Sequence, residues 1–262
     1  MSRPTFTVII PTHNRAHLLP RAIRSVLAQT FTDFELIVVD DASTDETPQV
    51  VASVQDGRII YLRHEENRGA AATRNTGICH ARGKYVAFLD DDDEYLPEFL
   101  AETRQHLETA SEEAGFSWCG VRVVQDGGQG ERTIGEGVWR PAFQDREHAY
   151  LSFLRSRRIG TNCGLCVRRD CFDVVGLFDQ ALRKAEDTDF LIRLVRHYDF
   201  VVVPKVLVKV HAHAGPKLHR LRRPHGPGLR THHAETPGHP AAPSSPLGPD
   251  ALQDRLAPLP RG

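Results

Sequence analysis

Short apolar runs alternate with helix-like segments along the first 110 residues. The runs at residues 6–10, 35–40, 58–62 and 85–89 are rich in β-branched and aromatic residues, which predicts four buried strands. Between them, apolar residues recur at helical spacing over 18–27, small residues fill 69–80, and Ser43 with Glu46 fits a capping box that opens another helix. This alternation predicts an α/β fold with a mostly parallel central sheet and helices on both faces.

The pattern loosens after a predicted helix over residues 97–110. Two strands, at 116–124 and 133–139, are expected around a glycine-rich loop tip, and a short strand is expected at 163–167. The remaining predicted elements are two helices at 144–154 and 187–197 and two valine-rich strands around Pro204, at 201–203 and 206–210.

Composition changes sharply near residue 214. Ten of the 17 prolines lie from Pro216 onward, and that segment has no Phe, Tyr, Trp, Val, Ile or Met, so it cannot build a packed core. We therefore expect residues 215–262 to form a disordered tail rich in Pro, Arg and His. Two origins stay open for it, a genuine extension or an aberrant, out-of-frame end, because GC-rich coding DNA read out of frame gives such a composition.

The formal charge of −1 gives no indication of nucleic-acid binding, and we expect no nucleic-acid partner. Five scattered cysteines suit reduced thiols better than a disulfide framework. No basic N-terminal segment leads into an apolar stretch, and no run approaches the ~20 apolar residues of a membrane span. We therefore expect a cytoplasmic protein, with peripheral attachment at the inner face of a membrane left open.

Four consecutive aspartates, Asp90 to Asp93, follow the fourth apolar run. Ligands bind at the carboxyl ends of parallel strands, and this rule assigns loops 11–15, 40–43 and 90–93 to one edge of the sheet. Carboxylates this crowded repel one another, so a bound cation would stabilise them. The first strand, which Pro11 is expected to end, is not followed by Gly-x-Gly-x-x-Gly, and this disfavours a dinucleotide-binding domain.

Six blocks of sequence occur in a regular order, at residues 8–15, 37–45, 67–77, 83–93, 176–179 and 186–190. Together they resemble the large inverting glycosyltransferase family called family 2, whose members have a nucleotide-sugar-binding fold of the GT-A type. The resemblance covers residues 5 to about 214. It implies a GT-A domain over 1–214, with a nucleotide-binding half at about 1–110 and an acceptor half at about 111–214.

The resemblance also implies a divalent cation, Mg²⁺ or Mn²⁺. The family's Asp-x-Asp motif maps onto Asp90 and Asp92, so that Asp92 would ligate the metal while Asp90 contacts the ribose or the metal. Asp93 is a further candidate ligand, and Asp91 is expected to be only a turn residue. His213 matches a histidine after the last strand that could approach the diphosphate and is a further candidate metal ligand, with His211 as a competitor two residues away.

The first two loops would recognise the nucleotide base. By resemblance, Asp41 accepts the imide N–H of uracil with Asp40 beside it, and His13 stands where the family often has an aromatic residue. Arg74 is interpreted either as a cation for the base or phosphate neighbourhood or as a surface helix charge. Further nucleotide contacts are expected from Pro11, Thr12 and Asn14, because these residues lie in the first loop.

An inverting transfer requires a base that removes the proton from the acceptor hydroxyl. The family's Glu-Asp motif maps onto Glu186 and Asp187, which implies that Asp187 is this base and that Glu186 supports it or binds the acceptor. A helix N-terminus would also favour two acids there, so helix capping is the alternative interpretation.

The predicted function is transfer from a nucleoside-diphosphate sugar, chiefly a UDP-sugar, to a saccharide or lipid-linked acceptor. One alternative is a catalytically silent nucleotide-sugar-binding or assembly protein with a truncated acceptor domain. A sugar-phosphate nucleotidyltransferase is a third hypothesis, but it would need a Gly-rich basic loop that residues 11–15 do not provide.

Overall fold

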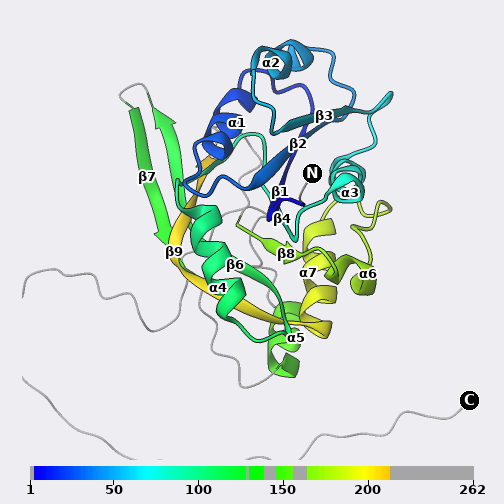
Figure 1. The fold of residues 1–262 in the computed structure, drawn as a ribbon, viewed down its shortest axis with the longest axis vertical. Helices are drawn as coiled ribbons and strands as arrows, with labels where there is room; N and C mark the ends of the chain where they lie inside the picture. Colours follow the sequence, from blue (N-terminus) through cyan, green and yellow to red (C-terminus); the bar gives the residue numbers. More distant parts are fainter. Residues whose placement is uncertain (1–2, 128–129, 139–145, 156–163, 213–262) are drawn as a thin grey trace, which may run out of the picture. The chain divides into compact units, whose positions relative to one another are not determined.

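A computed structural model describes residues 3–127, 130–138, 146–155 and 164–212, all within one unit that spans Met1–Leu218. Its strands form one sheet in the order β3-β2-β1-β4-β8-β6-β9-β5, with β7 paired to β6 (Figure 1). The elements are β1 (Phe6–Thr12), α1 (Leu19–Leu27), β2 (Phe34–Asp40), α2 (Thr47–Ser53), β3 (Ile59–Arg63), α3 (Ala70–His80), β4 (Tyr85–Phe88), β5 (Glu94–Tyr95), α4 (Phe99–Thr109), β6 (Ala114–Gly127), β7 (Gly130–Gly137), α5 (Arg146–Arg155), β8 (Cys166–Arg168), α6 (Cys171–Val175), α7 (Glu186–His197) and β9 (Asp199–Ala212). The predicted α/β fold class is confirmed, and the predicted tail lies outside the described residues.

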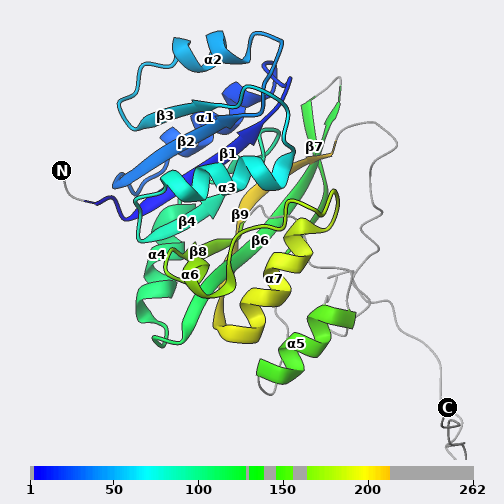
Figure 2. The same cartoon turned by 90° about the vertical axis from the view of Figure 1, so that its right-hand side faces the viewer.

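The neighbouring strands β3, β2, β1 and β4 are parallel and have a core on each face. Val8 and Ile10 of β1 belong to one core, together with apolar residues of α1 and α4. Ile9 belongs to the other core with residues of α3 and α7, which lie in front of the sheet in Figure 2. Because both faces are covered, these strands are apolar at nearly every position, as expected for buried parallel strands.

The sheet becomes mixed beyond β4. Strand β8 is antiparallel to β4 and β6, β6 is parallel to β9, and β5 is antiparallel to β9. The two strands expected around Pro204 are one strand, β9, whose register against β6 jumps from Cys119↔Val203 to Gly120↔Val206. Pro204 has no N–H to donate to the ladder, so the chain forms a bulge there and continues.

Two local predictions are wrong. Strand β1 does not end at Pro11 but continues to Thr12, which pairs with Asp40 of β2. The capping box of Ser43 and Glu46 is absent, and α2 begins at Thr47. Asp45, which precedes the N-cap residue Glu46, holds the first residue of the helix, since its Oδ1 accepts hydrogen bonds from the N–H and hydroxyl of Thr47.

Among the helices that the structure describes, none has both the length and the apolar character needed to cross a bilayer.

Candidate functional site

Pro11 sets the point at which the acidic loop leaves the sheet. The N–H of Leu89 donates to the carbonyl of Ile9. In a parallel ladder, the next bond on that side would come from the N–H of residue 11, which proline lacks. The pairing of β1 with β4 therefore stops, and the aspartates emerge beside the end of β1, where the edge rule predicts them.

Hydrogen bonds join the loops after β1 and β2. The N–H of Asn14 donates to Oγ of Ser43 at 2.9 Å, and Oδ1 of Asn14 accepts from the N–H of Thr44 at 2.7 Å. Nδ1 of His13 lies 2.7 Å from the carbonyl of Asp41. Thr12 is buried at the end of β1, whereas His13 and Asn14 are exposed. The exposed imidazole of His13 thus lies at the sheet edge, where a planar base could stack on it.

Asp40 and Asp41 are buried and bonded by the chain itself. Asp40 accepts from the N–H of Ser43 at 2.8 Å and from the Tyr61 hydroxyl. Oδ1 of Asp41 lies 2.7 Å from Nδ1 of His64. The Asp41 carboxylate also accepts from the backbone N–H groups of Arg68 and Gly69 at 2.9 and 2.8 Å. The two carboxylates therefore hold the loops in place, and a base contact would be additional to these bonds.

The four aspartates of the acidic loop, residues 90–93, have different surroundings. Asp91, expected to be only a turn residue, is buried and pairs with Nη1 of Arg15 at 2.8 Å. Burial raises the pKa of Asp91 to about 6, against the lowering effect of Arg15. Asp92 binds the same Nη1 at 2.7 Å. Asp93 is also buried, and its Oδ1 accepts from the N–H of His211 at 2.9 Å.

The acidic loop has a ligand set that suits a hard divalent cation. Asp90, Asp92 and Asp93 each offer a carboxylate oxygen, and these atoms lie within 4.8 Å of one another. Oxygen ligands and a small number of protein carboxylates are typical of Mg²⁺ and Mn²⁺ sites. Asp90 and Asp92 are partly exposed, which leaves one side open to a ligand. These residues therefore fit the predicted metal.

Helix α7 brings the Glu-Asp motif to the same edge. Ala185, in a left-handed conformation with φ of 64°, precedes Glu186 at the helix start. Nη1 of Arg74 donates to Oε1 of Glu186 and Nη2 donates to Oδ1 of Asp90, both at 3.0 Å. One guanidinium thus connects the acidic loop to the residue before Asp187.

Asp187 is partly buried, and its Oδ1 accepts from the N–H of Thr188 at 2.7 Å. Burial is the main cause that raises the pKa of Asp187, with the negative charge of Glu186 adding to it. The hydrogen bond from Thr188 and the charge of Arg74 oppose that rise. A carboxylate with a raised pKa is a better proton acceptor, as a general base requires.

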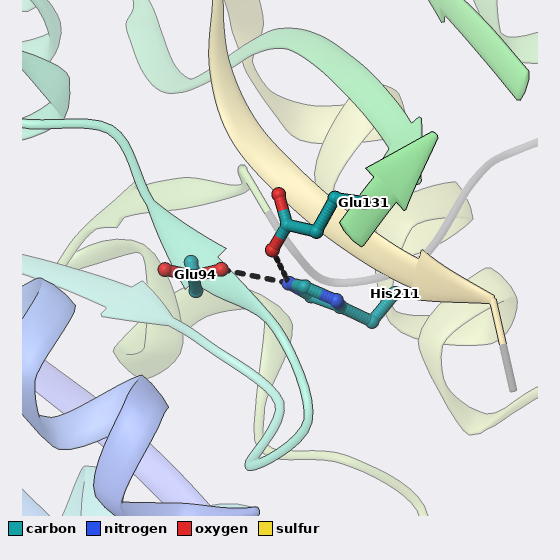
Figure 3. A group of neighbouring side chains, drawn as sticks. All are labelled: Glu94, Glu131 and His211. Carbon is teal, nitrogen blue, oxygen red and sulfur yellow. Dashed lines mark hydrogen bonds and ion pairs between the residues drawn. The ribbon is translucent and has the colours of Figure 1, made fainter. Parts of the chain in front are cut away.

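A second group of possible ligands consists of Glu94, Glu131 and His211 (Figure 3). Nε2 of the buried His211 lies 2.7 Å from Oε1 of Glu94 and 4.0 Å from Oε1 of Glu131. Nζ of Lys209 lies 3.2 Å from Glu94 and 3.0 Å from Glu131, so a cation of the chain already pairs with both carboxylates. This group is interpreted as an ion-pair network that fastens β5, β7 and β9 together.

His213, the predicted diphosphate-side histidine, lies outside the described residues. Its competitor His211 contacts the acidic loop, but through its backbone N–H.

Sequence reasoning missed three residues that shape the site. Arg15 binds two of the aspartates, His64 binds Asp41, and Asn75 holds the segment before α7. A signal existed for Arg15, because it is a cation in the loop that faces the acidic run. No pattern in the sequence indicated His64, since its partner Asp41 lies 23 positions away.

The known proteins that this chain resembles are glycosyltransferases. A family model described as "Glycosyl transferase family 2" matches residues 7–172. WcaA of Escherichia coli (strain K12), named for colanic acid biosynthesis, is 33% identical over 201 residues, which cover 75% of this chain and 68% of WcaA. A GalNAc(5)-diNAcBac-PP-undecaprenol beta-1,3-glucosyltransferase of Campylobacter jejuni is 36% identical over 160 residues, 60% of this chain and 50% of that protein.

The fold also matches a solved structure. The crystal structure of S. aureus TarS 1-349 in complex with UDP-GlcNAc aligns with a TM-score of 0.64 and 25% identity, covering 80% of this chain and 59% of TarS 1-349. The matched part of the chain thus spans about half to two thirds of the length of these relatives. With both the family model and the E. coli relative in agreement, the chain belongs to glycosyl transferase family 2.

Proposed function

We propose that this protein transfers a sugar from a nucleoside-diphosphate sugar to an acceptor hydroxyl, with inversion at the anomeric carbon. The observation that carries the proposal is the bridge from Asp90 through Arg74 to Glu186, with both bonds at 3.0 Å. It joins a carboxylate cluster suited to a metal-bound diphosphate with a partly buried carboxylate suited to act as a base. The family match ends at residue 172, so the role of Asp187 rests on this geometry and on the motif.

Asp90, Asp92 and Asp93 would hold Mg²⁺ or Mn²⁺. When bound, such a cation neutralises the charge that develops on the leaving diphosphate. Nη1 of Arg15 binds Asp92 in this structure, and this ion pair would break when the carboxylate binds the metal. His213 is proposed as a further contact, because it follows two residues after His211, whose N–H is bonded to Asp93.

The nucleotide would lie along the ends of β1 and β2. His13 offers a ring for stacking, Thr12 and Asn14 offer polar groups, and Asp40 and Asp41 fix the loop that carries them. The UDP-GlcNAc complex of TarS supports a UDP-sugar as the donor.

Asp187 would accept the proton of the attacking hydroxyl. Its raised pKa supports this role, and Glu186 would orient the site through its bond to Arg74. The proton passes to Oδ of Asp187 as the new bond to the anomeric carbon forms and the bond to the diphosphate breaks.

The acceptor is proposed to be a saccharide or a lipid-linked saccharide in polysaccharide biosynthesis. The name of the C. jejuni relative includes an undecaprenol-linked glycan, and that of WcaA includes colanic acid. A lipid-linked acceptor would bring the protein to the inner face of a membrane as a peripheral protein. Residues 1–214 would form the catalytic domain, with the acceptor half beginning near residue 111.

Calorimetry with UDP, GDP and dTDP, each with and without Mn²⁺, tests the donor assignment on the full chain. Mn²⁺-dependent binding of UDP is expected to be the tightest, and release of UDP from a UDP-sugar is expected on addition of the acceptor. Binding of UDP with no turnover of any UDP-sugar would instead support the catalytically silent alternative. Tighter binding of GDP would contradict the UDP assignment.

A further inference from the structure

Arg74 lies between the two catalytic motifs. Its side chain is only 8% exposed, and its guanidinium contacts Oδ1 of Asp90 and Oε1 of Glu186 at the same distance of 3.0 Å. Asp90 comes from the loop after β4, whereas Glu186 is the first residue of α7. The bond to Glu186 spans 112 positions of sequence. A single planar guanidinium therefore sets the spacing between the two elements.

Helix α3 holds Arg74 in place. Gly77 of α3 packs so closely on β1 that a Cβ there would lie 2.6 Å from Cγ2 of Ile9. Asn75 forms two hydrogen bonds with the backbone of Phe178, of 2.8 and 2.9 Å, so the segment before α7 is attached to the same helix. The guanidinium carbon of Arg74 lies 5.8 Å from the centre of the Phe178 ring. The helix that carries Arg74 is thus attached both to β1 and to the segment before α7.

The charges around Arg74 favour a role in positioning other residues over a direct contact with the diphosphate. An arginine that binds a diphosphate usually faces the ligand, but two guanidinium nitrogens of Arg74 already donate to carboxylates of the chain. Loss of the guanidinium would leave the partly exposed Asp90 and the more buried Glu186 without this cation. It would also leave the negative charge of Glu186 beside Asp187 without the opposing charge of Arg74.

We propose that Arg74 is a positioning residue for the transfer reaction, which holds the start of α7 at a fixed distance from the acidic loop. This inference rests on the proposed function and differs from both interpretations drawn from the sequence, a contact to the base or phosphate and a surface helix charge. Arg74 acts through Glu186 and Asp90, and through them it sets where Asp187 stands relative to the donor sugar.

The test compares Arg74→Gln and Arg74→Lys with a matched control, Arg193→Gln. Arg193 also holds the segment before α7, through the carbonyls of Val175 and Leu177 and through Asp189, but it has no bond to the acidic loop. For Arg74→Gln we expect kcat to fall about 100-fold, the loss typical of a misplaced catalytic group. The affinity for UDP with Mn²⁺ should change by less than about threefold. Arg74→Lys, which keeps the charge but lacks the planar fork, should recover part of kcat.

A second measurement needs no activity. Titration of the Asp187 carboxyl by ¹³C NMR, assigned with Asp187→Asn, should show a higher pKa in Arg74→Gln than in the parent, and no change in Arg193→Gln. The proposal is overturned if UDP affinity in Arg74→Gln falls as far as kcat/KM, since Arg74 would then be a donor ligand. It is also overturned if the Asp187 pKa stays unchanged. A parent protein that turns over no UDP-sugar would contradict the proposed function, while the NMR titration would still decide the role of Arg74.

Discussion

The backbone N–H of His211 donates a hydrogen bond to Oδ1 of Asp93 at 2.9 Å, although the two residues are 118 positions apart. The side chain of His211 reaches the residue that follows the loop, Glu94 of β5, with Nε2 2.7 Å from Oε1. The last strand, β9, therefore holds the acidic loop at Asp93, while Arg74 holds it at Asp90. Both attachments come from parts of the chain that are remote in sequence.

Replacement of His211 by Ala should destabilise the protein. The buried side chain loses its bond to a carboxylate, which costs about 1.5–3 kcal/mol. Urea unfolding measures the change in the free energy of unfolding, with His80→Ala on the exposed end of α3 as the control. Equal effects of the two replacements would show that the network drawn in Figure 3 does not stabilise the fold.

Asp41→Asn should reduce stability and UDP affinity together. The carboxylate accepts from Arg68, Gly69 and His64, and an amide nitrogen in its place would face an N–H group. We expect a loss of about 1–3 kcal/mol in the free energy of unfolding. A variant with weaker UDP binding but unchanged stability would mean that Asp41 serves the base alone.

The apolar pattern predicted the parallel half of the sheet because β1, β2 and β4 are buried on both faces. Two elements were not predictable in this way. Strand β5 has only two residues. It forms because Tyr95 pairs with Val208 of β9 and the N–H of Leu96 donates to the carbonyl of Leu207, and β9 is distant in the sequence. Helix α6 has five residues, too few to show a helical period.

The site was predictable in its residue types but not in its pairings. The edge rule placed the loops of Asp41 and Asp90 on one side of the sheet correctly, since it depends only on strand direction. Charge alone could not show that Asp91 would be buried on Arg15, or that Arg74 would bridge Asp90 and Glu186. These pairings depend on how helices pack, which a local pattern does not contain.

Metal affinity should respond in opposite directions to Asp92→Asn and Arg15→Gln. The first change removes a proposed ligand, and the second removes a cation that lies 2.7 Å from that ligand. We expect Mn²⁺ binding in the presence of UDP to weaken about tenfold or more in Asp92→Asn and to strengthen a few-fold in Arg15→Gln. Calorimetry measures both, and weaker binding in Arg15→Gln would mean that this arginine contributes to the site.

The pH dependence of activity should reflect Asp187. A base must be ionised, and burial raises the pKa of Asp187. As the pH is lowered, kcat/KM should therefore begin to fall at a higher pH than an ordinary aspartate would give.

The same raised pKa lowers the stability of the parent protein at neutral pH, because burial disfavours the ionised carboxylate in the folded state. Asp187→Asn should therefore be more stable than the parent at neutral pH, and this advantage should disappear below about pH 4. Thermal unfolding across this range checks the sign, and a variant less stable than the parent at neutral pH would contradict it.

In the proposed reaction, Asp187 is the base and the acidic loop holds the donor sugar nucleotide. Single-turnover release of UDP from a UDP-sugar, with acceptor and Mn²⁺ present, tests the role of Asp187 by comparing the parent with Asp187→Asn and Glu186→Gln. Loss of a general base predicts that Asp187→Asn is slower by about 10²–10⁴-fold while its UDP affinity is unchanged. A rate in Asp187→Asn equal to that of the parent would show that Asp187 is not the base.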